Sequence, residues 1–294
     1  MNPSDSRPVR TLALLAAGVL GACGGSADPP SPPPAGPARR IVSLAPSHTE
    51  LLFALGAGGS VVGATRFCDR PPEALALPRV GDAKSVSLEA VAALEPDLVV
   101  VNAEATAEAL APLRGRVRVL AVPTDTLPQL LDAVGVLGEA AGRAERAKTL
   151  RAEMEAALEA ARARASGRTR SRVLLVVQRE PFVVAGGGSY VDALLRALGH
   201  ENAAGDLGLP WPSLSAEAVL ALAPDAVVDA ALGPAGRAGE GAAVRAYWAR
   251  FPMLPAVRDG RVRPLADEAA LRPGPDVAGA LRALEESVAP GGGR

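Results

Sequence analysis

The sequence predicts an α/β protein of two lobes, each with a mainly parallel sheet flanked by helices, joined by one long backbone helix. Three observations support this prediction. Short apolar runs alternate with helical stretches from Arg40 onward, an order typical of parallel sheets with helices on both faces. The segment Ser85–Val100 is repeated at Ser213–Val228, with eleven of sixteen positions identical. The segment Ala144–Ala165 lies between the repeats and has no Pro or Gly.

The first predicted lobe covers residues 40–143, and its first helix has a clear start signal. Ser47 stands three residues before Glu50, which is the spacing of a capping box, and an apolar run follows until Gly56. The apolar runs predict four strands, at Ile41–Leu44, Val61–Gly63, Leu98–Val101 and Val117–Val122.

The second predicted lobe covers residues 167–290 and is expected to repeat the topology of the first. The repeat above supports this, and Ser189–Asp192 weakly echoes Ser47–Glu50 at another predicted helix start. The glycine-rich residues 186–188 before Ser189 lack the Gly-Lys-Ser/Thr ending of a phosphate-binding loop. They predict a turn and an N-cap.

The segment predicted to join the lobes, 144–166, has an amphipathic helical pattern. Leu150, Met154, Leu158 and Ala161 recur at helical spacing, while Glu and Arg occupy the other faces. A helix of about 22 residues spans roughly 33 Å. We expect it to act as a stiff strut that limits lobe movement. The alternative is a surface helix within one lobe.

The N-terminus has the features of an export signal. Residues 1–22 hold Arg7 and Arg10 and then the apolar run Thr11–Leu20, which is too short to span a bilayer core of roughly 30 Å. Residues 20–23 read Leu-Gly-Ala-Cys and resemble the lipobox of bacterial lipoproteins, so Cys23 is the expected lipidation site. An ordinary signal peptide with an incidental Cys is the alternative.

The Pro-rich stretch 23–39 predicts an extended tether, because such a composition cannot build a core. We therefore expect a periplasmic or cell-surface lipoprotein held at a membrane by its anchor. Once Cys23 is lipidated, Cys68 has no disulfide partner left in the chain.

Composition excludes several functions. The net charge of −1 gives no basis for binding nucleic acid or an anionic membrane surface. Two Cys and two His are too few for a zinc cage of the structural type unless all four converge. Neither a G-x-S-x-G elbow nor an H-E-x-x-H motif is present. We predict a protein that is not an enzyme, with no metal site or cofactor of its own.

Motifs spread along the whole body resemble the helical-backbone metal-chelate receptors of ABC importers, the class III periplasmic substrate-binding proteins. The resemblance runs from about Arg40 to about Val288 and is strongest to the cobalamin-binding members. The motifs that carry it are residues 40–52 (RIVSLAPSHTELL), 61–63 (VVG), 67–72 (FCDRPP), 80–81 (VG), 88–89 (LE) and 96–99 (PDLV).

This resemblance implies a monomeric receptor that captures cobalamin or a related corrinoid and delivers it to a permease dimer with an ATPase. The family also contains receptors for haem and ferric siderophores, which stay open as alternatives. A bilobal chelatase-like enzyme and a scaffold module without a small ligand are further alternatives.

Three segments are expected to border the ligand, because open α/β sheets bind ligands beyond the carboxyl ends of their strands. They are Thr65–Asp69, Arg179–Phe182 and Leu209–Pro212. Phe67, Phe182 and Trp211 lie on these segments, and a large flat ligand needs flat apolar contacts. The resemblance implies that these three aromatic residues contact the corrinoid. The alternative is that they belong to the core of each lobe.

One departure from the cobalamin-binding members concerns the walls of this site. Those relatives place Trp near the positions of Ala83 and Asn102, where this chain has small or polar residues. The site is therefore expected to be wider, or to hold a different corrinoid or chelate.

Charged and polar residues on the same loops are candidates for ligand contacts. Arg66, Arg179 and Arg272 can pair with carboxylates or phosphates, which haem or a siderophore would use more than cobalamin. His48 can ligate the metal centre of a bound chelate or hydrogen-bond a loop carbonyl.

Glu89 and Glu217 hold the same position in the two repeats. The resemblance implies that each forms a salt bridge with an arginine of one permease subunit. The alternative is that these are helix N-terminal acids favoured by the helix dipole.

Overall fold

The structure is a computed structural model that describes residues 36–82, 85–167, 169–231 and 240–289. The expected signal peptide, the lipidation site Cys23, Ala83 and most of the tether lie outside these residues. These described residues form one compact unit. No helix in the described part of the chain is both long and apolar enough to cross a membrane.

The N-terminal lobe is built on a four-stranded parallel sheet of order β2-β1-β3-β4. Its strands are β1 (Ile41–Ser43), β2 (Val61–Ala64), β3 (Leu98–Val101) and β4 (Arg118–Ala121). The helices of this lobe are α1 (Pro46–Ala54), α2 (Leu88–Ala93), α3 (Glu104–Ala109) and α4 (Leu127–Ala140). All four strands predicted from the apolar runs are confirmed, with bounds that differ by at most one residue.

The C-terminal lobe has a mixed sheet whose central strand, β5 (Arg172–Arg179), pairs in parallel with β9 (Ala226–Asp229) and β7 (Glu201–Asn202). The strand β10 (Val262–Pro264) extends the parallel part. The short strands β6 (Phe182–Val184) and β8 (Ser213–Leu214) add an antiparallel edge. The helices are α6 (Tyr190–Ala197), α7 (Ala216–Leu222), α8 (Glu240–Trp248), α9 (Pro255–Arg258) and α10 (Val277–Val288).

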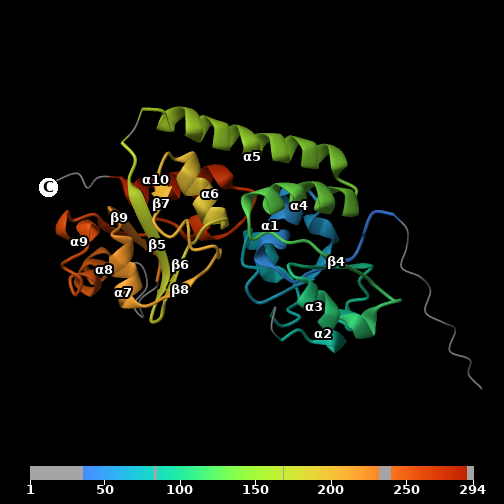
Figure 1. Ribbon diagram of the computed structural model, residues 1–294. Coiled ribbons are helices and arrows are strands. Elements are labelled where there is room, and N and C mark those ends of the chain that lie inside the picture. The colour runs from blue at the N-terminus through green and yellow to red at the C-terminus, as the bar shows by residue number, and fades with distance from the viewer. Residues whose placement is uncertain (1–35, 83–84, 168, 232–239, 290–294) are drawn as a thin grey trace, which may run out of the picture. The chain divides into compact units, whose positions relative to one another are not determined.

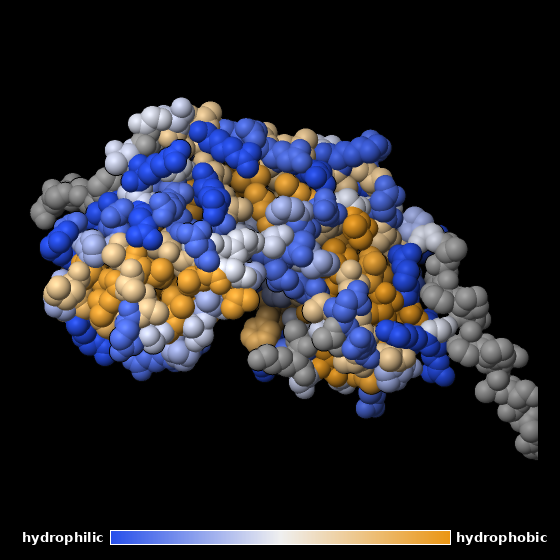
Figure 2. Space-filling model, viewed as in Figure 1, coloured by the Kyte–Doolittle hydropathy of each residue, from blue (hydrophilic) through white to orange (hydrophobic). Residues whose placement is uncertain are grey.

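The long helix α5 (Ala144–Ala165) joins the lobes and has the predicted bounds. Its apolar positions Leu150, Met154, Leu158 and Ala161 are buried, and it packs against α4 of one lobe and against α6 and α10 of the other (Figure 1). The buried apolar residues of α5 belong to one hydrophobic core that also includes residues of β1 in the first lobe and of β5 in the second. The outer face of α5 is hydrophilic (Figure 2). Because α5 shares its core with both lobes, it couples them as a strut.

The internal repeat found in the sequence is also a repeat of backbone geometry. Ser87 caps α2 by accepting a hydrogen bond from Ala90 N at 3.1 Å, and Ser215 caps α7 in the same way from Ala218 N at 3.2 Å. After these helices, Glu95 and Ala223 occupy matching positions, and both have a φ of 44°. Two non-glycine residues thus adopt the left-handed conformation at the same turn of each lobe.

The Ala223→Gly substitution should raise the free energy of unfolding by about 0.5–1 kcal/mol, because glycine has no Cβ to crowd a left-handed backbone. The control is Ala218→Gly in the interior of α7, which should lower the free energy of unfolding by about 1 kcal/mol. Urea unfolding of both variants shows whether their free energies of unfolding change in these opposite directions. A loss of stability in Ala223→Gly would show that this turn carries no strain.

Candidate functional site

The loop that follows β2 carries the first predicted aromatic contact. Phe67 is 54% exposed, and the guanidinium of Arg66 lies 4.8 Å from the centre of its ring. Arg66 also forms a salt bridge with Asp82 at 2.8 Å. Phe67 therefore presents a flat apolar surface at the carboxyl end of a parallel strand, where the fold places ligands.

Two ion pairs connect this loop to the segment before α10. The Arg272 guanidinium lies 2.5 Å from Asp69 Oδ1, and Arg70 lies 3.8 Å from Asp267. The hydrogen bond from Arg272 holds the pKa of Asp69 below its usual range. The same pair raises the pKa of Arg272. Both groups are therefore ionised at neutral pH, and they join the two lobes at the predicted site.

An acidic side chain lies close to these pairs. Burial raises the pKa of Glu50, and the positive charges of Arg272 and Arg70 partly oppose that shift. Glu50 Oε1 is buried without a hydrogen-bond partner among the described residues. The buried Tyr190 has a raised pKa, first because of burial and then because of the charges of Asp276 and Glu50. Glu50 is therefore a buried carboxyl group close to the Arg272 guanidinium, and its burial favours the protonated form.

His48 lies inside the N-terminal lobe. Its ring is fully buried, and Nε2 lies 2.7 Å from the carbonyl oxygen of Val122. Burial lowers the pKa of His48 to about 4, so the ring is neutral at pH 7. The structure therefore shows the hydrogen bond to a loop carbonyl, and metal ligation by His48 stays a prediction that this packing does not favour.

The loop that precedes β8 carries the second exposed aromatic residue. Trp211 is 37% exposed, and Leu209 in the same loop is 59% exposed. Gly186 donates a backbone hydrogen bond to Pro210 O at 2.9 Å, and a Cβ at Gly186 would clash with Leu209 O. Glycine at this position thus lets the loop pack closely enough to present Trp211. This gives the glycine-rich stretch a structural role.

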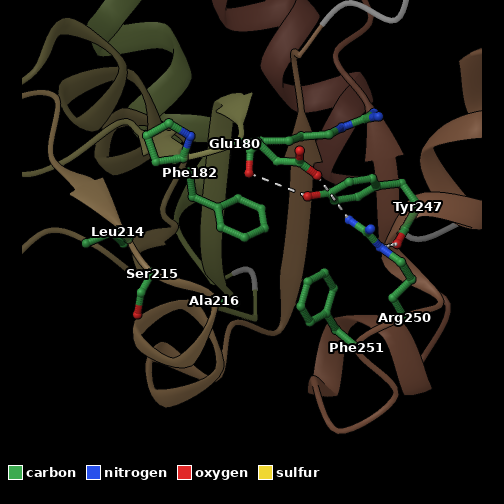
Figure 3. Close-up of a pocket in the computed structure, with 10 residues that line it drawn as sticks. Glu180, Phe182, Leu214, Ser215, Ala216, Tyr247, Arg250 and Phe251 are labelled. Atoms are coloured by element: carbon green, nitrogen blue, oxygen red, sulfur yellow. Dashed lines mark hydrogen bonds and ion pairs between the residues drawn. The ribbon is translucent and has the colours of Figure 1, made fainter.

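Phe182 has a different environment from Phe67 and Trp211. It is only 4% exposed, and its ring lies 5.6 to 6.3 Å from the rings of Tyr247, Trp248 and Phe251. This cluster borders a pocket of about 560 Å³ in the C-terminal lobe (Figure 3). The pocket is lined by Arg179, Glu180, Pro181, Phe182, Leu214, Ser215, Ala216, Tyr247, Arg250 and Phe251. Phe182 is part of the lobe core as well as of this pocket wall.

Two arginines of this pocket stack on one aromatic ring. The guanidinium groups of Arg179 and Arg250 lie 4.5 and 4.0 Å from the centre of the Tyr247 ring. Arg179 Nε also donates a hydrogen bond to the buried carboxylate of Asp229 at 2.9 Å. Arg250 lies 3.7 Å from Glu180. The positive charge of Arg179 is therefore already paired with the buried carboxylate of Asp229.

The two predicted docking acids lie in equivalent places. Glu89 and Glu217 are both exposed in the first turns of α2 and α7. Hydrogen bonds from its own backbone and from Ser215 lower the pKa of Glu217. Both carboxylates are available at the surface, and their docking role stays a prediction.

The predicted site residues thus fall into three groups. Arg66, Phe67 and Arg272 gather where the loop after β2 meets the segment before α10, and Trp211 lies on the loop before β8. Arg179 and Phe182 line the pocket of Figure 3. Figure 2 shows a hollow between the two lobes on the side away from α5.

Sequence reasoning did not single out Asp69 or Glu50 as site residues, and it missed the aromatic residues at the end of α8 and just after it. A signal for the last group existed, because three of the eight aromatic residues of the chain fall within residues 247–251. In the described part of the chain, no cluster of His, Cys, Asp and Glu can hold a metal ion.

Residues 41–269 match the sequence profile of the family described as periplasmic binding protein. This chain belongs to that family. The vitamin B12-binding protein of Salmonella typhimurium is 33% identical over 224 residues, which cover 75% of this chain and 81% of that protein. The periplasmic vitamin B12-binding protein BtuF of Vibrio cholerae has a TM-score of 0.72 at 25% identity, covering 86% of this chain and 97% of BtuF.

A haem-binding relative is similarly close in structure. The periplasmic heme-binding protein RhuT from Roseiflexus sp. RS-1 has a TM-score of 0.69 at 30% identity, with 85% of this chain and 98% of RhuT covered. The family resemblance and the two-lobe fold predicted from the sequence are confirmed. The chain is an extracytoplasmic binding protein of the ABC-importer type. It is not an enzyme, and binding proteins of this family carry a transported ligand and not a cofactor.

Proposed function

We propose that this periplasmic binding protein captures cobalamin or a related corrinoid and delivers it, as a monomer, to a permease dimer with an ATPase. The observation that carries the proposal is the exposure of Phe67 and Trp211, at 54% and 37%, on loops of a chain with only eight aromatic residues. Exposed aromatic rings on loops suit a broad, flat ligand. The relatives named for vitamin B12 binding support the corrinoid.

The proposal includes a lipid anchor at Cys23, which rests on the sequence alone. Residues 1–22 would be removed, residues 23–39 would form the tether, and the helix 144–166 would join lobes 40–143 and 167–290. In this arrangement the tether holds the binding body close to the permease.

A haem receptor is the second candidate, because a heme-binding relative shares the fold at 30% identity. Haem carries two propionates, and two candidate partners are Arg66, which stacks on Phe67, and Arg272, which contacts Asp69 of the same loop. The two candidates differ in the charge of the ligand, so they can be separated by direct binding.

Calorimetric titration of the purified chain with cyanocobalamin, cobinamide and haemin tests the proposal. We expect sub-micromolar corrinoid binding, about −8 kcal/mol or stronger. Trp211→Ala should weaken that binding by about thirtyfold, since truncating a partly buried Trp removes about 2 kcal/mol of apolar contact. Val136→Ala, at an exposed apolar side chain of α4, is a control that should leave corrinoid affinity unchanged. Tight haemin binding without corrinoid binding would replace the first candidate by the second.

A further inference from the structure

Each of the three predicted site arginines, and Arg70 beside them, has a carboxylate partner. These pairs are Arg66 with Asp82 at 2.8 Å, Arg70 with Asp267 at 3.8 Å, Arg179 with Asp229 at 2.9 Å and Arg272 with Asp69 at 2.5 Å. The positive charges that would attract a ligand carboxylate are therefore already balanced within the protein.

The pair between Arg272 and Asp69 has the most specific geometry of the four. Nη1 of Arg272 lies 2.5 Å from Oδ1 of Asp69, and Nη2 lies 3.4 Å from Oδ2, in a two-pronged contact. The side chains are 28% and 47% exposed, so the pair remains open to a ligand. The contact joins residues that are 203 positions apart, one in each lobe.

The charged groups around this pair are the carboxyl groups of Glu268 and Glu50 and the guanidinium of Arg70, which is itself paired with Asp267. The carboxylate of Glu268 lies 4.0 Å from Arg272, and Glu50 also acts on the Arg272 guanidinium. His48 is buried and neutral at pH 7, because its pKa is lowered to about 4. A ligand carboxylate placed at Arg272 would have to displace Asp69 and would also face the carboxylate of Glu268.

We propose that Asp69 sets the charge preference of the binding site, so that the protein selects metal chelates with uncharged amide side chains against chelates with carboxylates. This inference rests on the proposed function and names its substrate class. An amide N–H can donate to the remaining lone pairs of Asp69, and an amide oxygen can accept from Arg272. A carboxylate has no donor and meets like charge, which is a penalty against the wrong ligand.

A matched pair of corrinoids tests this proposal. Dicyanocobinamide carries amide side chains, whereas dicyanocobyrinic acid has the same ring and metal with carboxylates. The wild-type chain should bind the acid at least about tenfold more weakly than the amide, as expected for about 1.4 kcal/mol of repulsion. Asp69→Asn should tighten acid binding by about tenfold and weaken amide binding by about two- to threefold, because the neutral Asn releases Arg272 and accepts hydrogen bonds less strongly.

Two further variants separate this role from a general effect of charge. Asp132→Asn removes an exposed carboxylate of α4 that pairs with Arg151 of α5 at 3.1 Å, and it should leave the ratio of acid to amide affinity unchanged. The double variant Asp69→Asn/Arg272→Gln should lose the gain in acid binding, because the released guanidinium is gone.

The possible outcomes separate this inference from the proposed function. If corrinoids bind but Asp69→Asn leaves the acid-to-amide ratio unchanged, the role of Asp69 is overturned and the function stands. If no corrinoid binds any folded variant, the proposed corrinoid function is overturned. Haemin and its dimethyl ester, titrated into the same variants, then decide the inference. If Asp69→Asn raises the affinity for haemin relative to that for its dimethyl ester, the inference is supported. If the ratio of the two affinities is unchanged, or if neither ligand binds, the inference is overturned.

Discussion

Replacing Asp229 with Ala should lower the free energy of unfolding by about 3–5 kcal/mol. Asp229 ends β9, and its side chain is completely buried. Its carboxylate accepts hydrogen bonds from Arg179 Nε at 2.9 Å, from Trp248 Nε1 at 2.5 Å and from Ala231 N at 2.9 Å. Ala would leave the buried indole N–H and the mostly buried guanidinium without their partner, which is the costly way to break such a network.

Chemical or thermal unfolding measures this loss of stability. The Asp229→Asn variant separates the loss of the charge from the loss of the hydrogen-bond acceptors. Asn keeps acceptor oxygen but loses the charge, so it should lower the free energy of unfolding by less than Ala does. Asp132→Ala, at an exposed residue of α4 that pairs with Arg151 of α5, should change the free energy of unfolding by no more than about 0.5 kcal/mol. A loss below 1 kcal/mol in Asp229→Ala would mean that the network does not stabilise the lobe.

The same network changes how Arg179 should be tested. The sequence suggested Arg179 as a partner for ligand carboxylates, but its guanidinium holds Asp229 and stacks on Tyr247. Arg179→Ala would leave a buried carboxylate with one partner fewer, so a loss of ligand binding could follow from damage to the lobe. Arg66 and Arg272 are better probes of ligand charge, because their carboxylate partners are not buried.

The parallel strands and the strut helix could be predicted because each has a signal within its own residues. Runs such as Leu98–Val101 are apolar and bounded, and α5 repeats its apolar positions over many turns. The antiparallel strands β6 and β8 have three and two residues, which is too short for a periodic pattern. The left-handed turn at Ala223 was hidden as well, because glycine is the residue that usually marks it.

The candidate site was only partly predictable for a similar reason. Phe67 and Trp211 are exposed, as expected of aromatic residues flanked by polar residues or Pro on loops. Phe182 begins a strand whose alternate residues face the core, and its aromatic partners on α8 and just after it lie 65 or more positions away. The contact of Arg272 with Asp69 spans 203 positions, so no local pattern could show it.

Reversing the charge of both Glu89 and Glu217 to Arg should lower ligand uptake through the cognate permease by about a hundredfold and leave ligand affinity unchanged. The two carboxylates are exposed at equivalent turns of the two lobes. The permease dimer of the proposed function would present the same basic surface to each of them. Like charges placed opposite each other cost several kcal/mol, and about 2.7 kcal/mol corresponds to a hundredfold change.

Uptake of labelled corrinoid into proteoliposomes that contain the permease and its ATPase measures this effect, with calorimetry on the same variants as the check on ligand binding. Each single charge reversal should lower uptake by about tenfold, because distant sites act independently. Glu104→Arg is the matched control, since Glu104 is also an exposed acid in the first turn of a helix, α3, but lies outside the repeat.

The control separates docking from the helix-dipole alternative. If the acids serve only the dipole, all three reversals should lower stability by similar fractions of a kcal/mol and leave uptake alone. If the repeated acids dock the protein, only Glu89→Arg and Glu217→Arg should lower uptake, and the loss should lessen as salt weakens the repulsion. The duplicated position of the two glutamates would then be explained by the two-fold symmetry of the partner.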